Sequence, residues 1–205
     1  QTNITQNIFN SVIQQGGLAG LLQGQNPEVI NAQVNRQIDL ATPAEQSQSI
    51  DTTPLPKLSG SSPTAVKKYL NQVAVIMQKN LSPFTKDDLD LFLEILQSQN
   101  LQRLSELHPY QQAMEKSITE LNNLSVPADI VWLQAKEISY LQKSIQQIAT
   151  FENAETDPAA AMASIPPHID LKVAFIVFHK TQLPNWIYEN KIPVTSADKA
   201  VYLLH

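Results

Sequence analysis

The spacing of apolar side chains in the middle of this chain most strongly limits what it can fold into. Val66, Leu70 and Val73 recur at intervals of four and three residues, which places them on one face of an α-helix. Directly before them, Ser62-Pro63 supplies the polar N-cap and the first-turn proline that are typical of a helix start. The pattern therefore predicts a helix from residue 63.

Three more helices are predicted after this one. The second has Thr85 as its expected N-cap and is apolar almost all round, which is typical of a central helix. The third spans about 109–124 and the fourth about 127–152. Short connections predict an all-α fold, with an antiparallel helical bundle of about four core helices over residues 63–152. The expected stripe of the fourth helix is Ile130, Gln134, Ile138, Leu141, Ile145 and Ile148.

Residues 153–205 are predicted to form extra C-terminal helices. Asp157-Pro158 repeats the cap-and-proline pattern of a helix start. Residues 169–180 are an apolar run, and periodicity alone does not distinguish a buried helix from a strand there. We favour a helix, because no partner strand is evident elsewhere in the sequence.

Residues 1–40 are predicted to form an N-terminal amphipathic, helical arm, joined to the bundle by a Pro/Ser/Thr-rich linker over 41–62. The arm has apolar side chains at helical spacing, followed by a segment with four of the five glycines. It could bind a protein partner or a second copy of the chain, and it could equally fold back on the bundle. The side chains that would make such contacts are Ile4, Ile8, Phe9, Val12, Leu18, Leu21 and Leu22.

Trp186 and Tyr188 are the other candidates for partner contact. They lie in Pro184-Asn185-Trp186-Ile187-Tyr188, which resembles a loop. Aromatic side chains are frequent at the centres of protein interfaces. Packing and partner contact are equally good interpretations of Trp186.

The composition excludes several classes of protein. Charged residues make up 16% of the chain, against about 25% in a typical globular protein, whereas there are 22 glutamines and 14 asparagines. A net charge of −5 does not provide the basic surface that nucleic acids need. The chain has no cysteine, which excludes disulfides, thiolate nucleophiles and cysteine zinc sites.

Catalytic and metal-binding motifs are also missing. The four histidines lack the spacing of a helical metal pair and are predicted to be surface or capping residues. Asp87, Asp88 and Asp90 do not form a calcium loop, because Leu93 stands where such a loop needs glycine. We therefore predict no catalytic, cofactor-binding or metal-binding residues. Paired carboxylates leave no local signature, so a hydrolytic site stays open as an alternative.

The longest apolar runs are shorter than the ~20 residues that span a bilayer, so no transmembrane segment is expected. The chain starts at Gln1 instead of Met. A removed leader or a trimmed sequence would both produce this start, and a leader would imply export or tethering to a membrane.

Two short motifs carry a resemblance to known proteins. They are Leu124-Ser125-Val126-Pro127 before a long helix, and Asp157-Pro158-Ala159-Ala160-Ala161 about thirty residues later. With them, residues 64–160 resemble a group of uncharacterised helical proteins of candidate-phyla (Patescibacteria-type) bacteria. These proteins are predicted to be exported and often occur near type IV pilus or secretion genes. Members often have a Leu-His pair on the long helix, where this chain has Trp132-Leu133-Gln134. The resemblance implies an envelope or extracellular location and no particular activity.

Together these features predict an exported, non-enzymatic protein of the cell envelope or the extracellular space. It would act through protein–protein contacts, as a subunit or accessory of a surface or pilus-like assembly. A small-ligand-binding or hydrolytic helical domain is one alternative, and a cytoplasmic helical adaptor is another.

Overall fold

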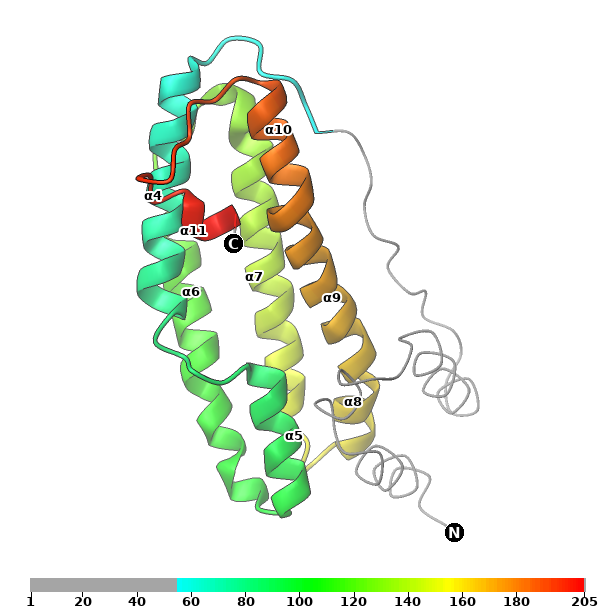
Figure 1. Ribbon diagram of the computed structural model, residues 1–205. Helices are drawn as coiled ribbons and strands as arrows, with labels where there is room; N and C mark the ends of the chain where they lie inside the picture. The colour runs from blue at the N-terminus through cyan, green and yellow to red at the C-terminus, as the bar shows by residue number, and fades with distance from the viewer. Residues whose placement is uncertain (1–54, 205) are drawn as a thin grey trace. The chain divides into compact units, whose positions relative to one another are not determined.

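The computed structural model describes residues 55–204, in which all regular secondary structure is helical (Figure 1). This confirms the predicted all-α fold. Residues 169–180 are helical, with a wider π-helical turn at their end. The helices are α4 (Pro63–Leu81), α5 (Asp88–Ser98), η1 (Leu101–Leu107), α6 (His108–Asn122), η2 (Ala128–Ile130), α7 (Val131–Glu152), α8 (Pro158–Ala163), α9 (Ile165–Val177), η3 (Phe178–Gln182), α10 (Leu183–Glu189) and α11 (Val201–Leu204).

Two of the predicted helix starts are confirmed and one is corrected. The Ser62 hydroxyl accepts a hydrogen bond from the backbone N–H of Ala65 at the start of α4, and Asp157 caps α8 in the same way. The cap of α5 is Asp87 and not Thr85, because the Asp87 carboxylate accepts the backbone N–H of Leu89 at 3.0 Å. A carboxylate also interacts more favourably than a hydroxyl with the positive end of a helix.

The described residues divide into two compact units. Unit 1 consists of residues 86–108 and 148–167, and unit 2 consists of residues 55–85, 109–147 and 168–204. The predicted bundle range 63–152 contributes to both units.

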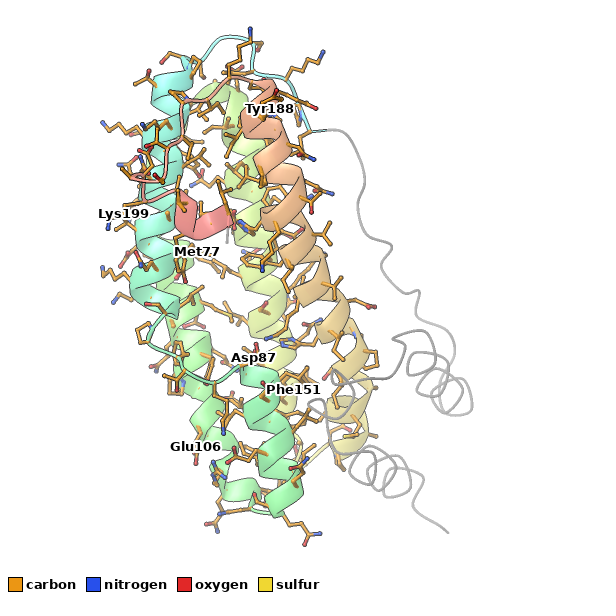
Figure 2. All side chains as sticks on the ribbon, viewed as in Figure 1. Met77, Asp87, Glu106, Phe151, Tyr188 and Lys199 are labelled. Atoms are coloured by element: carbon orange, nitrogen blue, oxygen red, sulfur yellow. The ribbon has the colours of Figure 1, made fainter. Side chains whose placement is uncertain are left out.

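Unit 2 has a bundle core to which helices α4, α6, α7 and the α9–α10 segment all contribute. Helix α4 supplies the largest share of the buried side chains, and Met77 lies on its inner side (Figure 2). Helix α5, whose apolar surface predicted a central place, belongs to unit 1. The largest fully buried side chains of unit 2 are Tyr69, Leu70, Met77, Leu121, Ile130, Leu133 and Phe178.

Unit 1 is built around two stacked aromatic rings. Phe92 of α5 and Phe151 of α7 lie with their ring centroids 4.3 Å apart and their planes 14° apart. Both side chains are fully buried. Ile95, Leu107 and Ile148 complete this apolar centre.

Residues 55–61, which we call the N-terminal strap, are held to the other elements of unit 2. The indole Nε1 of Trp186 donates to the carbonyl oxygen of Pro56 at 2.6 Å, and the backbone N–H of Leu58 donates to Oδ1 of Asn190 at 2.9 Å. The Asp129 carboxylate accepts hydrogen bonds from the Ser59 hydroxyl and from the backbone N–H groups of residues 60 and 61. The last residues of the predicted linker are thus fixed by hydrogen bonds.

Candidate functional site

The predicted contact residues fall into three groups. The seven apolar residues of the arm, from Ile4 to Leu22, lie outside the described residues. Trp186 lies in helix α10 and not in a loop, and its side chain is 3% exposed. It packs edge-on against Trp132 with ring centroids 5.4 Å apart and donates its N–H to the strap. Its observed contacts are those of a core residue.

Tyr188 is different, because its side chain is 85% exposed. It lies two residues after Trp186, near the end of α10 (Figure 2). The structure therefore brings Trp186 into the core and leaves Tyr188 available for contact.

A buried pair of ionisable side chains lies in the core of unit 2. Glu137 of α7 is fully buried and His179 of η3 is 5% exposed. Atom Nε2 of His179 lies 3.2 Å from Oε1 of Glu137. Among the residues that the structure describes, none of the four side-chain oxygen and nitrogen atoms of Glu137 and His179 has a hydrogen-bond partner, so the two groups are in ion-pair contact without a hydrogen bond. In this low-dielectric interior, each group therefore relies on the other to offset the hydration that it has lost.

Tyr69 of α4 is the third member of this polar cluster. Its side chain is 1% exposed, and its hydroxyl has no hydrogen-bond partner within residues 55–204. Burial, and then the nearby negative charge of Glu137, raise the pKa of the Tyr69 hydroxyl. The phenol therefore stays protonated and can act as a donor.

The π-helical turn that carries His179 has a local cause in the sequence. Pro184 has no backbone N–H, and its ring would clash with the carbonyl group of residue 180 in a regular α-helix. The chain opens into the wider turn η3 just before this proline and closes again in α10. Such turns are frequent at functional sites.

The cluster contains the components of acid–base chemistry without access for a substrate. A carboxylate next to an imidazole can orient it and stabilise its charged form. A general base must lie within hydrogen-bond distance of the atom from which it takes a proton. Both side chains are buried, and the imidazole of His179 packs against the rings of Phe175 and Phe178. In this structure the pair joins α7 to η3.

For two histidines the predicted position is wrong. His168 and His179 were predicted at the surface or at helix caps, but both are buried. The Nδ1 atom of His168 lies 2.7 Å from Oε1 of Gln147. Within residues 55–204, no group of three or more histidine, aspartate or glutamate side chains is arranged to hold a metal ion.

Three apolar side chains, two of them exposed and one half-buried, form a row on α9 that we call the α9 stripe. It consists of Ile169, Val173 and Ile176, which lie at intervals of four and three residues and so share one helix face. Val173 is 40% exposed and Ile176 is 50% exposed. Asp170 and Lys180 flank the two ends of the stripe.

A shallow groove of about 520 Å³ also runs along the outer face of α4. Its walls carry Lys67 and Asn71, both of which already contact Asp198. The groove is open and mostly apolar, and Val75 is the most exposed apolar side chain in it.

One helical stretch, Pro158–Glu189, is long and apolar enough to cross a membrane by length and composition alone. Its most apolar 18-residue window has a mean hydropathy of 1.3, and 22% of that window is buried. The sequence analysis expected no such stretch. A core helix of a soluble protein can meet the same criterion, and the stretch contains the α9 stripe.

Comparisons with known proteins returned no match: no family model, no curated protein and no solved structure is similar to this chain.

Proposed function

We propose that this chain is an exported, non-enzymatic protein that acts through protein–protein contacts at the cell envelope or outside the cell. It would serve as a subunit or accessory of a surface or pilus-like assembly. The observation that carries this proposal is the α9 stripe, where branched apolar side chains are exposed in a chain with few charges. Exposed apolar patches of this kind are typical of contact surfaces.

Two further features support the proposal. Tyr188 offers an exposed aromatic side chain, and aromatic side chains are enriched at interface centres. The amphipathic sequence pattern of residues 1–40 predicts a second contact element. The resemblance to exported helical proteins suggests the location.

The contact function can be tested on the full chain by static light scattering. We expect the protein to associate with itself or with an envelope partner, and we expect Ile8→Asp combined with Val12→Asp to weaken that association. Val131→Asp is a matched control, because Val131 is exposed at the start of α7, outside both contact elements. A protein that stays monomeric and binds no envelope fraction at any concentration would contradict the proposal.

Location is tested separately by fractionating cells of the source organism and detecting the chain with an antibody. Recovery in the envelope or the medium is expected. Recovery in the cytoplasm alone would favour the helical adaptor.

The Glu137–His179 pair supports a second candidate, a hydrolytic or small-ligand-binding domain. Two converging titratable groups with a nearby phenol are a plausible acid–base set. This candidate requires an opening that brings solvent to His179. Diethyl pyrocarbonate, a reagent for accessible imidazoles, should modify His179 in the native protein if such an opening occurs, and protection of His179 would contradict it.

A further inference from the structure

We propose that the α9 stripe is the contact surface for a second copy of this chain, with the two α9 helices packed antiparallel. The inference rests on the proposed contact function and names the partner of that surface. It is argued from the charges at the ends of the stripe.

The charges at the two ends of the stripe have opposite signs. Asp170 precedes Val173 by three residues, and Lys180 follows Ile176 by four, so each of these charges borders the apolar row near one end. Lys172 also borders the row, beside Ile169 and Ile176, but it already interacts with another described residue. At about 1.5 Å per residue, the charges of Asp170 and Lys180 are roughly 15 Å apart along the helix. When a second copy packs antiparallel against such a surface, the acid of each copy lies opposite the base of the other.

Asp170 and Lys180 are both available for such a contact. Neither forms an ion pair or a hydrogen bond with another residue of the described part of the chain. Asp170 is half-buried, and this burial raises the pKa of its carboxyl group. A lysine brought by a second copy would offset the cost of desolvating this carboxylate.

The same charges distinguish between the possible arrangements. In an antiparallel pair, Asp170 of each copy faces Lys180 of the other, which gives two opposite-charge contacts. In a parallel pair, Asp170 faces Asp170 and Lys180 faces Lys180, so both contacts are repulsive. The apolar residues follow the same symmetry, because a two-fold axis midway between the two charges, near residue 175, places Val173 of one copy beside Ile176 of the other.

The expected dimer is weak. Three branched side chains from each copy form an interface smaller than the 1,200–2,000 Å² that is usual for stable complexes. We therefore expect reversible association at roughly micromolar concentrations or above. Such a contact suits an assembly in which other contacts raise the local concentration.

Disulfide trapping in the full chain tests this arrangement directly. The chain has no cysteine, so each engineered thiol reports on one position. Under mild oxidation, a mixture of Val173→Cys and Ile176→Cys chains should give more linked dimer than either variant alone. Val75→Cys is the matched control, because Val75 is 45% exposed on α4, outside the stripe, and it should give little.

A charge exchange provides the second measurement. Asp170→Lys and Lys180→Asp should each weaken dimerisation about fivefold in sedimentation equilibrium at low salt, and the double variant should restore it. Val173→Lys should weaken it at least tenfold, since it places a charge inside the apolar contact. These changes lie at exposed or half-buried positions, and a circular dichroism spectrum checks that each variant is folded.

Three results would overturn the proposal. Stronger trapping of each cysteine variant with itself than in the mixture would indicate a parallel pair. Association that depends on residues 1–40 and is unchanged by Val173→Lys would identify the arm as the contact, and the proposed contact function would then stand without this dimer. Binding of vesicles by a protein that stays monomeric would identify lipid as the occupant of the stripe.

Discussion

Among the described residues, the two compact units differ in where their ion pairs lie, because only unit 2 has an ion pair in its core. In unit 1 the interior is centred on the stacked rings of Phe92 and Phe151, and the ion pairs of Arg103 with Glu94 and Glu106 lie at the surface. In unit 2 a glutamate and a histidine are paired inside the core. Water can replace a lost partner at the surface of unit 1 but has little access to the core of unit 2.

This difference shows that the contribution of an ion pair to the free energy of unfolding depends on whether the pair is exposed or buried. Exposed pairs are screened by water and by salt, and most contribute little. A buried pair has already lost the hydration of both groups, so the removal of one partner leaves a charge without compensation. Four predictions test this contrast, from the largest expected effect to the smallest.

The largest effect is expected for His179→Leu. The change leaves the Glu137 carboxylate buried without its imidazole partner, and the free energy of unfolding should fall by about 3–5 kcal/mol. Urea denaturation of the full chain measures this loss. The double variant Glu137→Leu with His179→Leu should recover most of the loss, because it buries no charge. Equal losses in the single and double variants would show that the pair is not coupled.

The next effect is expected for Trp186→Phe, which concerns the strap of unit 2. Phenylalanine keeps an aromatic ring in the core but cannot donate to the carbonyl oxygen of Pro56. The loss of this hydrogen bond and of some packing should cost about 1–2 kcal/mol, and the strap should become more sensitive to limited proteolysis. Tyr188→Phe is the control, because Tyr188 is 85% exposed, and it should change neither measurement.

The helical fold could be predicted from the sequence because its signals are local. Ser62-Pro63 and Asp157-Pro158 satisfy the first turns of their helices with atoms from neighbouring residues, and both predicted starts are confirmed. The wrong prediction of Thr85 as the N-cap of α5 also has a local cause. Asp87, two residues later, can accept the free N–H groups of the same first turn. Boundaries shift by a residue or two where two capping residues are close together.

The buried pair could not be predicted in the same way, because it depends on contacts between distant residues. The stripe predicted for α7 runs through Gln134 and Ile138, because these positions continue a near-heptad spacing. The buried face instead runs through Leu133 and Glu137, four residues apart. Glu137 lies at helical spacing from Ile130 and Leu141, and this spacing was the available signal for a buried acid. Its partner His179 lies 42 residues later in the chain, so no local pattern links the two.

The third prediction concerns pH and the carboxylate that holds the strap. The Ser59 hydroxyl, followed by the backbone N–H groups of residues 61 and 60, lowers the pKa of Asp129 far below its usual range. Unfolding therefore takes up a proton below about pH 4, so this stabilisation is complete above that pH and is lost as the pH falls. Asp129→Asn should show a smaller decrease in urea midpoint between pH 7 and pH 3 than the unchanged chain. Equal decreases would contradict a role for Asp129 in acid sensitivity.

The smallest effect is expected for Arg103→Gln in unit 1. Arg103 lies 2.8–2.9 Å from carboxylate oxygens of Glu94 and Glu106. The pKa of Glu94 is lowered by hydrogen bonds from Lys86 and then from Arg103, and the pKa of Glu106 is lowered by its hydrogen bonds from Arg103. All three side chains are at least 30% exposed, so water hydrates the carboxylates when the guanidinium is removed. We expect a thermal midpoint within experimental scatter of the unchanged chain at 0.15 M salt, with a small decrease only at low salt. A loss as large as that of His179→Leu would remove the contrast between the two units, because surface and buried pairs would then contribute alike.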